Sequence, residues 1–272
     1  MENVELIQGS AVEAAGKRQL RADQLPAAII LNSADNVKSL EYLQQLRNRF
    51  RGTLSTSSLT DFCSYVKSAA ATGASYPGFV DVEKMHANVF FNLGTVEQPG
   101  HADWRATLGL LPTAAYKALN ALESRRFDQA ALIDWLEDWN DVLVADFTDG
   151  NASLTRAVAA IRKMKISTKA ESTHTTGDFG ASRSALEEVE ASSADALPVG
   201  FRMATEPYEG LSPRSFALKL SVLTGGDKPV LTLRWLRKEQ QLEEIAREFK
   251  HVLGGQLADA ATLTIGTFDP GK

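Results

Sequence analysis

Residues 215–236, SFALKLSVLTGGDKPVLTLRWL, carry the strongest structural pattern in the chain. Large apolar side chains occupy every second position in both halves of this stretch: Phe216, Leu218, Leu220, Val222, and then Leu231, Leu233 and Trp235. A period of two places such side chains on one face of a β-strand. Thr224-Gly225-Gly226-Asp227 separates the two halves and predicts a turn, because glycine adopts positive φ at little cost. The stretch therefore predicts an antiparallel hairpin.

Outward from this hairpin, the sequence alternates between patterns typical of strands and of helices. Further strands are expected at residues 50–57, 78–93 (a hairpin turning near Glu83-Lys84), 104–111, 165–174, 200–205 and 262–268. Helices are expected at residues 39–47, 58–71, 112–143 (interrupted near Arg125-Arg126), 153–163 and 238–253, the last ended by Gly254-Gly255. This order predicts an α+β fold, with a mainly antiparallel sheet, packed helices and a helical middle segment.

The chain shows no break in composition strong enough to divide it. Residues 1–26 are rich in Ala, Gln and charge without a firm period, which predicts a flexible N-terminal arm. Residues 27–272 are expected to form a single α+β domain. The alternative is that residues 112–163 form a helical subdomain inserted into it.

Composition places the chain among ordinary soluble globular proteins. Of its 272 residues 44% are hydrophobic and 23% charged, and a net charge of −5 argues against general electrostatic binding of nucleic acid but allows a local basic patch. The single cysteine, Cys63, cannot form an internal disulfide and is typical of a reducing compartment. We expect no signal peptide, because residues 1–19 lack a basic segment followed by an apolar core, and no membrane partner, because the longest apolar runs are far shorter than a membrane span. The predicted location is the cytoplasm.

Two basic clusters are candidate nucleic-acid contacts. Arg47, Arg49 and Arg51 alternate, so an extended chain would present three guanidinium groups on one side, an arrangement that suits phosphate or carboxylate binding. The second cluster consists of Arg162, Lys163 and Lys165. The competing interpretation is that these cations lie in solvent or pair with the carboxylates of this acidic chain.

An apolar stripe in the second half of the helical middle segment is a candidate interface. It consists of Phe127, Leu132, Trp135, Leu136 and Trp139. Two tryptophans one helical turn apart on such a face either complete the core of the monomer or contact another subunit, since tryptophan is enriched at interface hot spots.

The sequence contains only weak candidates for catalytic chemistry. His101 and Asp103 place an imidazole and a carboxylate two residues apart, as in metal sites, but a third ligand is not evident and the pair also suits a loop that follows Pro99-Gly100. Cys63 lies on an apolar stripe and is expected in the core. We therefore assign no catalytic residue, no metal and no cofactor.

Several stretches of the chain also resemble one protein family. They are Arg49-Phe50-Arg51-Gly52, Phe90-Phe91-Asn92-Leu93-Gly94, Pro99-Gly100-His101-Ala102-Asp103, Phe127 with Trp135-Leu136-Glu137-Asp138, residues 157–163, Ser215-Phe216-Ala217-Leu218, residues 224–231 and Gly266-Thr267-Phe268. Together they are similar, in order, to the YfdQ-like family of phage and prophage proteins. The resemblance implies a bacteriophage or prophage gene expressed in bacterial cytoplasm, and it implies no catalytic residues.

Three functions follow as hypotheses. The first is a non-catalytic phage protein that self-assembles into a homo-oligomer, with a structural role or a role in binding a host protein. The second is a nucleic-acid-associated accessory protein that contacts DNA in phage replication or recombination. The third is an enzyme whose site residues are scattered along the chain.

Overall fold

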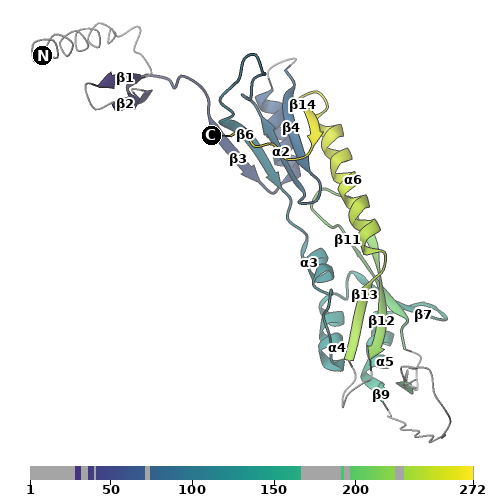
Figure 1. The fold of residues 1–272 in the computed structure, drawn as a ribbon. Helices are drawn as coiled ribbons and strands as arrows, with labels where there is room; N and C mark the ends of the chain where they lie inside the picture. The colour runs from purple at the N-terminus through teal and green to yellow at the C-terminus, as the bar shows by residue number, and fades with distance from the viewer. Residues whose placement is uncertain are drawn as a thin grey trace, which may run out of the picture.

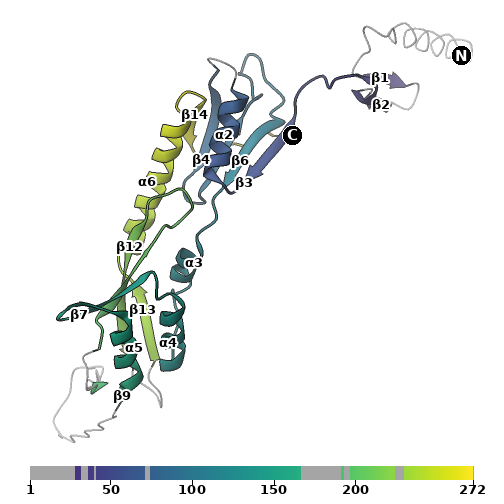
Figure 2. The same cartoon turned by 180° about the vertical axis from the view of Figure 1, so that it is seen from behind.

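The computed structural model describes residues 28–31, 36–39, 41–70, 74–166, 191–192, 197–223 and 230–271. In this part of the chain two five-stranded sheets lie at the two ends of an elongated body, with helices packed against them (Figures 1 and 2). The predicted α+β class is confirmed. No helix in the described ranges is both long and apolar enough to cross a bilayer.

The first sheet, called here the antiparallel sheet, is built around the predicted hairpin. Its strands, in spatial order, are β13 (Val230–Trp235), β12 (Arg214–Leu223), β11 (Gly200–Thr205), β7 (Leu143–Phe147) and β8 (Gly150–Ala152). Leu218 lies opposite Trp235 on one side and Phe201 on the other. The hairpin and the strand at 200–205 are confirmed, while the predicted turn at 224–227 lies outside the described residues.

The inner face of the antiparallel sheet is buried. Phe216, Leu218 and Leu220 lie in the core, as the alternation predicts. Three helices complete this half of the core: α3 (Ala114–Asn120), α4 (Gln129–Asp138) and α5 (Leu154–Lys163). Each fully buried Leu or Phe side chain contributes about 1.5–3 kcal/mol, so this face stabilises the sheet strongly.

The second sheet, called the mixed sheet, combines parallel and antiparallel pairs. Its order is β14 (Ala261–Ile265), β4 (Tyr76–Asp81), β5 (His86–Phe90), β6 (Trp104–Gly109) and β3 (Gly52–Thr56). The two outer pairs, β14 with β4 and β3 with β6, are parallel, and the inner pairs are antiparallel. The strands expected at 50–57, 78–93, 104–111 and 262–268 are thereby confirmed; β3 and β6 are shorter than expected, while β4 and β14 begin slightly earlier.

Helix α2 (Leu59–Ala69) packs on the mixed sheet and follows its prediction closely. The Ser58 hydroxyl accepts a hydrogen bond from the Asp61 backbone N–H at 3.2 Å, which satisfies one of the free donors at the helix start. Its buried side chains are Leu59, Phe62, Cys63 and Val66, so Cys63 lies in the core as expected.

Helix α6 (Lys238–Leu257) runs alongside the mixed sheet and reaches down to β13 (Figure 1). The prediction that Gly254-Gly255 end this helix is wrong, because it continues to Leu257. Its apolar stripe also continues, with Leu253 and Leu257 fully buried. Their burial outweighs the helix penalty of about 1 kcal/mol for each glycine.

The helix expected at residues 39–47 is also wrong. The chain instead forms β2 (Asn36–Ser39), which pairs with β1 (Ala28–Leu31), and then a short 3₁₀ turn, η1 (Glu41–Leu43). Leu43 and Leu46 are exposed, so the apolar spacing has nothing to pack against. A short helix without a packing partner is not stable in water.

The helical middle segment contains strands as well as helices. The break predicted near Arg125-Arg126 is confirmed, since α3 ends at Asn120 and α4 starts at Gln129. Leu143, which was expected to end the second helix, starts β7 instead. Lys165–Ile166 forms β9 and pairs with β10 (Ala191–Ser192), and the rest of the strand predicted at 165–174 lies outside the described residues.

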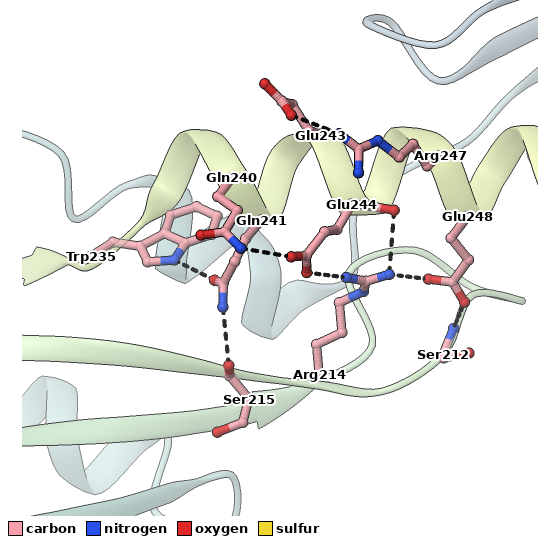
Figure 3. Close-up of polar contacts among 10 residues, drawn as sticks. All are labelled: Ser212, Arg214, Ser215, Trp235, Gln240, Gln241, Glu243, Glu244, Arg247 and Glu248. Carbon is pink, nitrogen blue, oxygen red and sulfur yellow. Dashed lines mark hydrogen bonds and ion pairs between the residues drawn. The ribbon is translucent and has the colours of Figure 1, made fainter.

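A polar network fastens α6 to the start of β12 (Figure 3). Arg214 contacts two carboxylates on successive turns of α6, Glu244 at 3.2 Å and Glu248 at 2.6 Å. The second oxygen of Glu248 accepts a hydrogen bond from the Ser212 N–H at 2.7 Å. The buried side chains of both sheets belong to one hydrophobic cluster. Because α6 extends from the antiparallel sheet to the mixed sheet (Figure 1), the network helps to join the two halves of the protein.

Candidate interaction site at the edges of the mixed sheet

Residues 41–51 lead into β3, the edge strand of the mixed sheet. Here the structure brings the arginine row of residues 47–51 next to the candidate metal pair of residues 101 and 103. In the described part of the chain β3 pairs only with β6. Arg49, from the first basic cluster, contacts Asp103, from the candidate metal pair. These residues lie far apart in the sequence, and the parallel pairing of β3 with β6 brings them together.

Asp103 is held by three hydrogen bonds at this edge. Arg49 donates from Nε at 3.0 Å and from its terminal nitrogen at 2.7 Å, both to Oδ2, and Asn92 donates to Oδ1 at 2.7 Å. The side-chain amide oxygen of Asn92 in turn accepts a hydrogen bond from the backbone N–H of Trp104 at 2.9 Å. The hydrogen bonds from Arg49, followed by the one from Asn92, lower the pKa of Asp103 to about 2.

This arrangement gives Asp103 a structural role. His101 is exposed, and the described residues contain no group of three or more His, Cys, Asp or Glu side chains placed to hold a metal ion. Both oxygens of Asp103 are occupied by donors, so the carboxylate fixes the entry of the chain into β3. His101 and Asp103 are therefore not assembled into a metal centre in this part of the chain.

The link between Arg49 and Asp103 predicts a pH dependence. Because the folded-state pKa of Asp103 lies below its ordinary value of 3.8, the stabilisation is present above pH 3.8 and is lost as the pH falls toward about 2. We expect wild type to melt at a higher temperature than Asp103→Asn at pH 7, and this difference to shrink between pH 4 and pH 2. Thermal unfolding of both proteins across that range measures it; a difference independent of pH would contradict the assignment.

The other basic residues have partners of their own or lie elsewhere. Arg51 pairs with Glu41 at 2.5 Å, whereas Arg47 is exposed. Arg162 and Lys163 lie at the end of α5, at the opposite end of the molecule from β3 (Figures 1 and 2), and Arg162 pairs with Glu137 at 3.3 Å. The Lys165 side chain lies outside the described part. The two clusters therefore do not form one continuous surface.

Four apolar side chains are exposed just before β3. Tyr42 and Leu46 are each 80% exposed, and Leu43 and Phe50 are exposed as well. We call these four residues the β3 patch. Scattered apolar side chains are normal on a surface, but four within nine residues, beside a sheet edge that has no partner strand among the described residues, make this patch a candidate contact surface. The same apolar residues at 39–47 led to the prediction of a packed helix, so the sequence does not distinguish an exposed patch from a buried helix face.

The opposite edge of the mixed sheet is similar. β14 pairs only with β4 in the described ranges; Ile265, its last residue, is exposed, and so is Phe268, three residues further along the chain. Phe268 stacks on Phe79, with ring centroids 4.7 Å apart. Strands β14, β4, β6 and β3 run in one direction and β5 in the other. The two unpaired edges are therefore parallel to one another.

The predicted Trp interface lies mainly inside the protein. Phe127, Leu132, Trp135 and Leu136 are buried, and Trp139 is half-buried against the same core. These four buried side chains therefore complete the monomer's own core, which is the first of the two alternatives given for this stripe. A subunit contact by Trp139 remains a prediction.

Cys63 is not placed for nucleophilic chemistry. It is buried between α2 and the mixed sheet, and this burial raises the pKa of its thiol to about 11. At neutral pH the thiol is protonated and packs as a small apolar side chain.

These observations define an α+β protein with two five-stranded sheets, and within the described ranges both edges of the mixed sheet lack a further strand. The chain belongs to the family described as "Uncharacterized conserved protein (DUF2303)", whose model matches residues 2–268. No curated protein matches the chain, and no solved structure matches it either.

Proposed function

We propose that this chain is a non-catalytic protein that self-associates, and that β3 of one copy pairs with β14 of the next. The observation that supports the proposal is that both edges of one sheet, parallel to one another, lack a partner strand in the described part of the chain and have exposed apolar side chains at or next to them. Backbone N–H and C=O groups along an open edge are a template for pairing with another chain. Contact between two different edges would continue the mixed sheet from copy to copy.

Such a contact is heterologous, because each copy uses two different surfaces. Heterologous contacts form a closed ring when the rotation between copies closes, and a filament when it does not. The mass of a closed ring is fixed, whereas a filament grows with protein concentration, so the two forms can be told apart in solution. We infer a closed homo-oligomer with a structural role or a role in binding a host protein.

The biological setting is part of the same proposal. The resemblance of residues 49–268 to the YfdQ-like proteins supports a phage or prophage gene, and the single buried cysteine suits the bacterial cytoplasm. Nucleic-acid binding has less support, since Arg49, Arg51 and Arg162 pair with the chain's own carboxylates and the two basic clusters lie at opposite ends.

The mass of the protein in solution tests the proposal. At micromolar concentration and physiological salt, light scattering should give a multiple of 29.5 kDa. Leu46→Glu, which places a charge in the β3 patch, should reduce the mass to that of one chain because a contact that excludes water penalises an unpaired carboxylate. Leu111→Glu is the matched control: Leu111 is 63% exposed but lies between the two sheets, so this change should leave the mass unaltered.

A mixing experiment separates the heterologous contact from a symmetric one. Ile265→Glu disables the β14 edge and Leu46→Glu disables the β3 patch, so each variant alone should be a monomer. Mixed in equal amounts, they retain one intact pair of edges and should give a mass of two chains. A 29.5 kDa mass for the unaltered protein would overturn self-association, and a mixture that stays monomeric would overturn the pairing of β3 with β14.

A further inference from the structure

A groove of about 350 Å³ runs along the outer edge of β13, at the antiparallel sheet and away from the edges considered above. The segment of residues 119–126 forms its other wall. Of the apolar side chains that line it, Leu223 at the end of β12 and Trp235 keep exposed surface, whereas Leu119, Leu122 and Leu233 are buried.

Beside this groove, the outer edge of β13 makes only one isolated β-bridge among the described residues. Phe127 and Leu231 exchange two hydrogen bonds, N–H to C=O at 2.9 Å and at 2.8 Å, on the side of β13 away from β12. Before Phe127 the chain turns away through Ser124, whose φ of 62° is in the left-handed region. The place that a neighbouring strand would occupy opposite Leu233 is therefore left to the groove.

Backbone N–H and C=O groups point to alternate sides along a strand. Those of Leu233 and Trp235 therefore point away from β12, as those of Leu231 do. The even-numbered residues make the hydrogen bonds on the β12 side. In this register the Leu236 N–H donates to the Ala217 carbonyl at 2.9 Å. Within the described ranges, the N–H and C=O of Leu233 and the N–H of Trp235 have no hydrogen-bond partner. Three backbone groups thus face the groove ready to pair.

The rim of the groove carries an excess of positive charge. Arg125, Arg126, Arg234 and Lys238 line it together with a single carboxylate, Glu123, which pairs with Lys238. Arg125 also lies over the Phe127 ring, 4.5 Å from its centre. Arg126 and Arg234 make no ion pair with any described residue. In a protein with net charge −5, this local excess favours an acidic occupant.

The two faces of β13 fix the pattern of that occupant. Leu233 faces the core and is buried, whereas Arg234 is exposed on the opposite face. A strand paired with β13 would place alternate side chains beside Leu119 and Leu122 on the inner face and beside Arg234 on the outer face. Apolar residues suit the first set and acidic residues the second.

We propose that the edge of β13 binds an extended segment of a partner protein with alternating apolar and acidic residues, which adds an antiparallel strand to the sheet. Main-chain hydrogen bonds to Leu233 and Trp235 supply the pairing, and the arginines of the rim select acidic side chains. This site is separate from the edges assigned to self-association, so each proposal can fail without the other.

The test uses the full-length protein and a fluorescein-labelled peptide of alternating Glu and Val, seven residues long. Fluorescence anisotropy should show saturable binding. Three matched peptides should bind at least tenfold more weakly, on the order of one missing hydrogen-bonded or charged contact. They are a Lys-Val alternation, a block sequence of the same composition, and the Glu-Val peptide N-methylated on the residues that face β13.

Variants of the rim locate the binding site. Arg126→Glu combined with Arg234→Glu should weaken binding of the Glu-Val peptide about tenfold or more, because both side chains are exposed and their reversal repels the peptide. Lys250→Glu, an exposed charge reversal on α6 that does not line the groove, should leave binding unchanged.

Several results would overturn the proposal. They are no saturable binding of the Glu-Val peptide, equal binding of the N-methylated or block peptide, and unchanged binding by the double variant. Light scattering with and without the peptide supplies the last check. If the peptide splits an oligomer into single chains, a second copy occupies the groove and the inference of a separate partner is wrong.

Discussion

The Leu218→Asp variant is expected to lose the folded state. Leu218 is buried at the centre of β12, between Trp235 on one neighbouring strand and Phe201 on the other. The change removes an apolar contribution of about 2 kcal/mol and buries a carboxylate that has no partner, which together exceed about 5 kcal/mol. A folded domain is stable by only about 5–15 kcal/mol, so most of the protein should be insoluble or unfolded at 25 °C.

Lys219→Asp provides the matched control for this prediction. Lys219 is the next residue of the same strand, but its side chain is exposed on the other face. The same acid introduced there should cost less than about 1 kcal/mol. Soluble yield and cooperative urea unfolding, followed by circular dichroism, compare the two variants. A soluble Leu218→Asp protein with a wild-type unfolding midpoint would show that the face assigned to the core is wrong.

The features that the sequence predicted correctly depend on neighbours along the chain. The alternation at Phe216 and Leu218 sets the face of β12, and the Ser58 cap sets the start of α2. Both signals lie within a few residues, where periodicity and capping chemistry act. The end of α6 was mispredicted because local chemistry favoured a stop at Gly254, whereas tertiary burial of Leu257 carries the helix further.

The mixed sheet shows what local patterns do not contain. Gly52 lies opposite Trp104, and Ala261 lies opposite Tyr76, in parallel pairs that connect distant parts of the chain. Nothing in the alternation of either strand specifies its neighbour. The same limit applies to the site, because the ion pair of Arg49 with Asp103 exists only once β3 and β6 are paired.

The two proposed binding surfaces depend on a further property that periodicity does not report. A row of apolar residues indicates one face of an element, but not whether another element covers it. The spacing of Leu43 and Leu46 is that of a packed helix, yet both side chains are exposed. The groove at β13 likewise depends on the chain turning away at Ser124, which follows from backbone conformation in three dimensions.

Replacing Arg214 is expected to give the second largest effect, because it leaves a carboxylate without its cation. The Arg214 side chain is 20% exposed and that of Glu248 is 15% exposed, so both charges are largely removed from water. Breaking a buried ion pair by removing one partner costs about 3–5 kcal/mol. Since these side chains keep some contact with solvent, we expect Arg214→Met to reduce the free energy of unfolding by about 2–3 kcal/mol.

A neighbouring ion pair on the same helix supplies the control. Arg247 pairs with Glu243 at 3.0 Å, but their side chains are 75% and 67% exposed, and such surface pairs contribute about 0–1 kcal/mol. Arg247→Met should therefore hardly change the urea midpoint. Adding Glu248→Gln to Arg214→Met should recover part of the loss, because it removes the unpaired charge while leaving an acceptor for the Ser212 N–H.

The effect of Arg214→Met should also depend on pH in a defined direction. Burial raises the pKa of Glu248, but the hydrogen bonds from Arg214 and Ser212 outweigh burial and lower it below its ordinary value of 4.5. The stabilisation that the Arg214–Glu248 pair gives the folded state is therefore present above pH 4.5 and is lost as the pH falls below that value. Urea unfolding of wild type and Arg214→Met should differ clearly at pH 7 and converge toward pH 3. Equal destabilisation at both values would mean that Arg214 stabilises the junction of α6 and β12 by packing of its aliphatic stem.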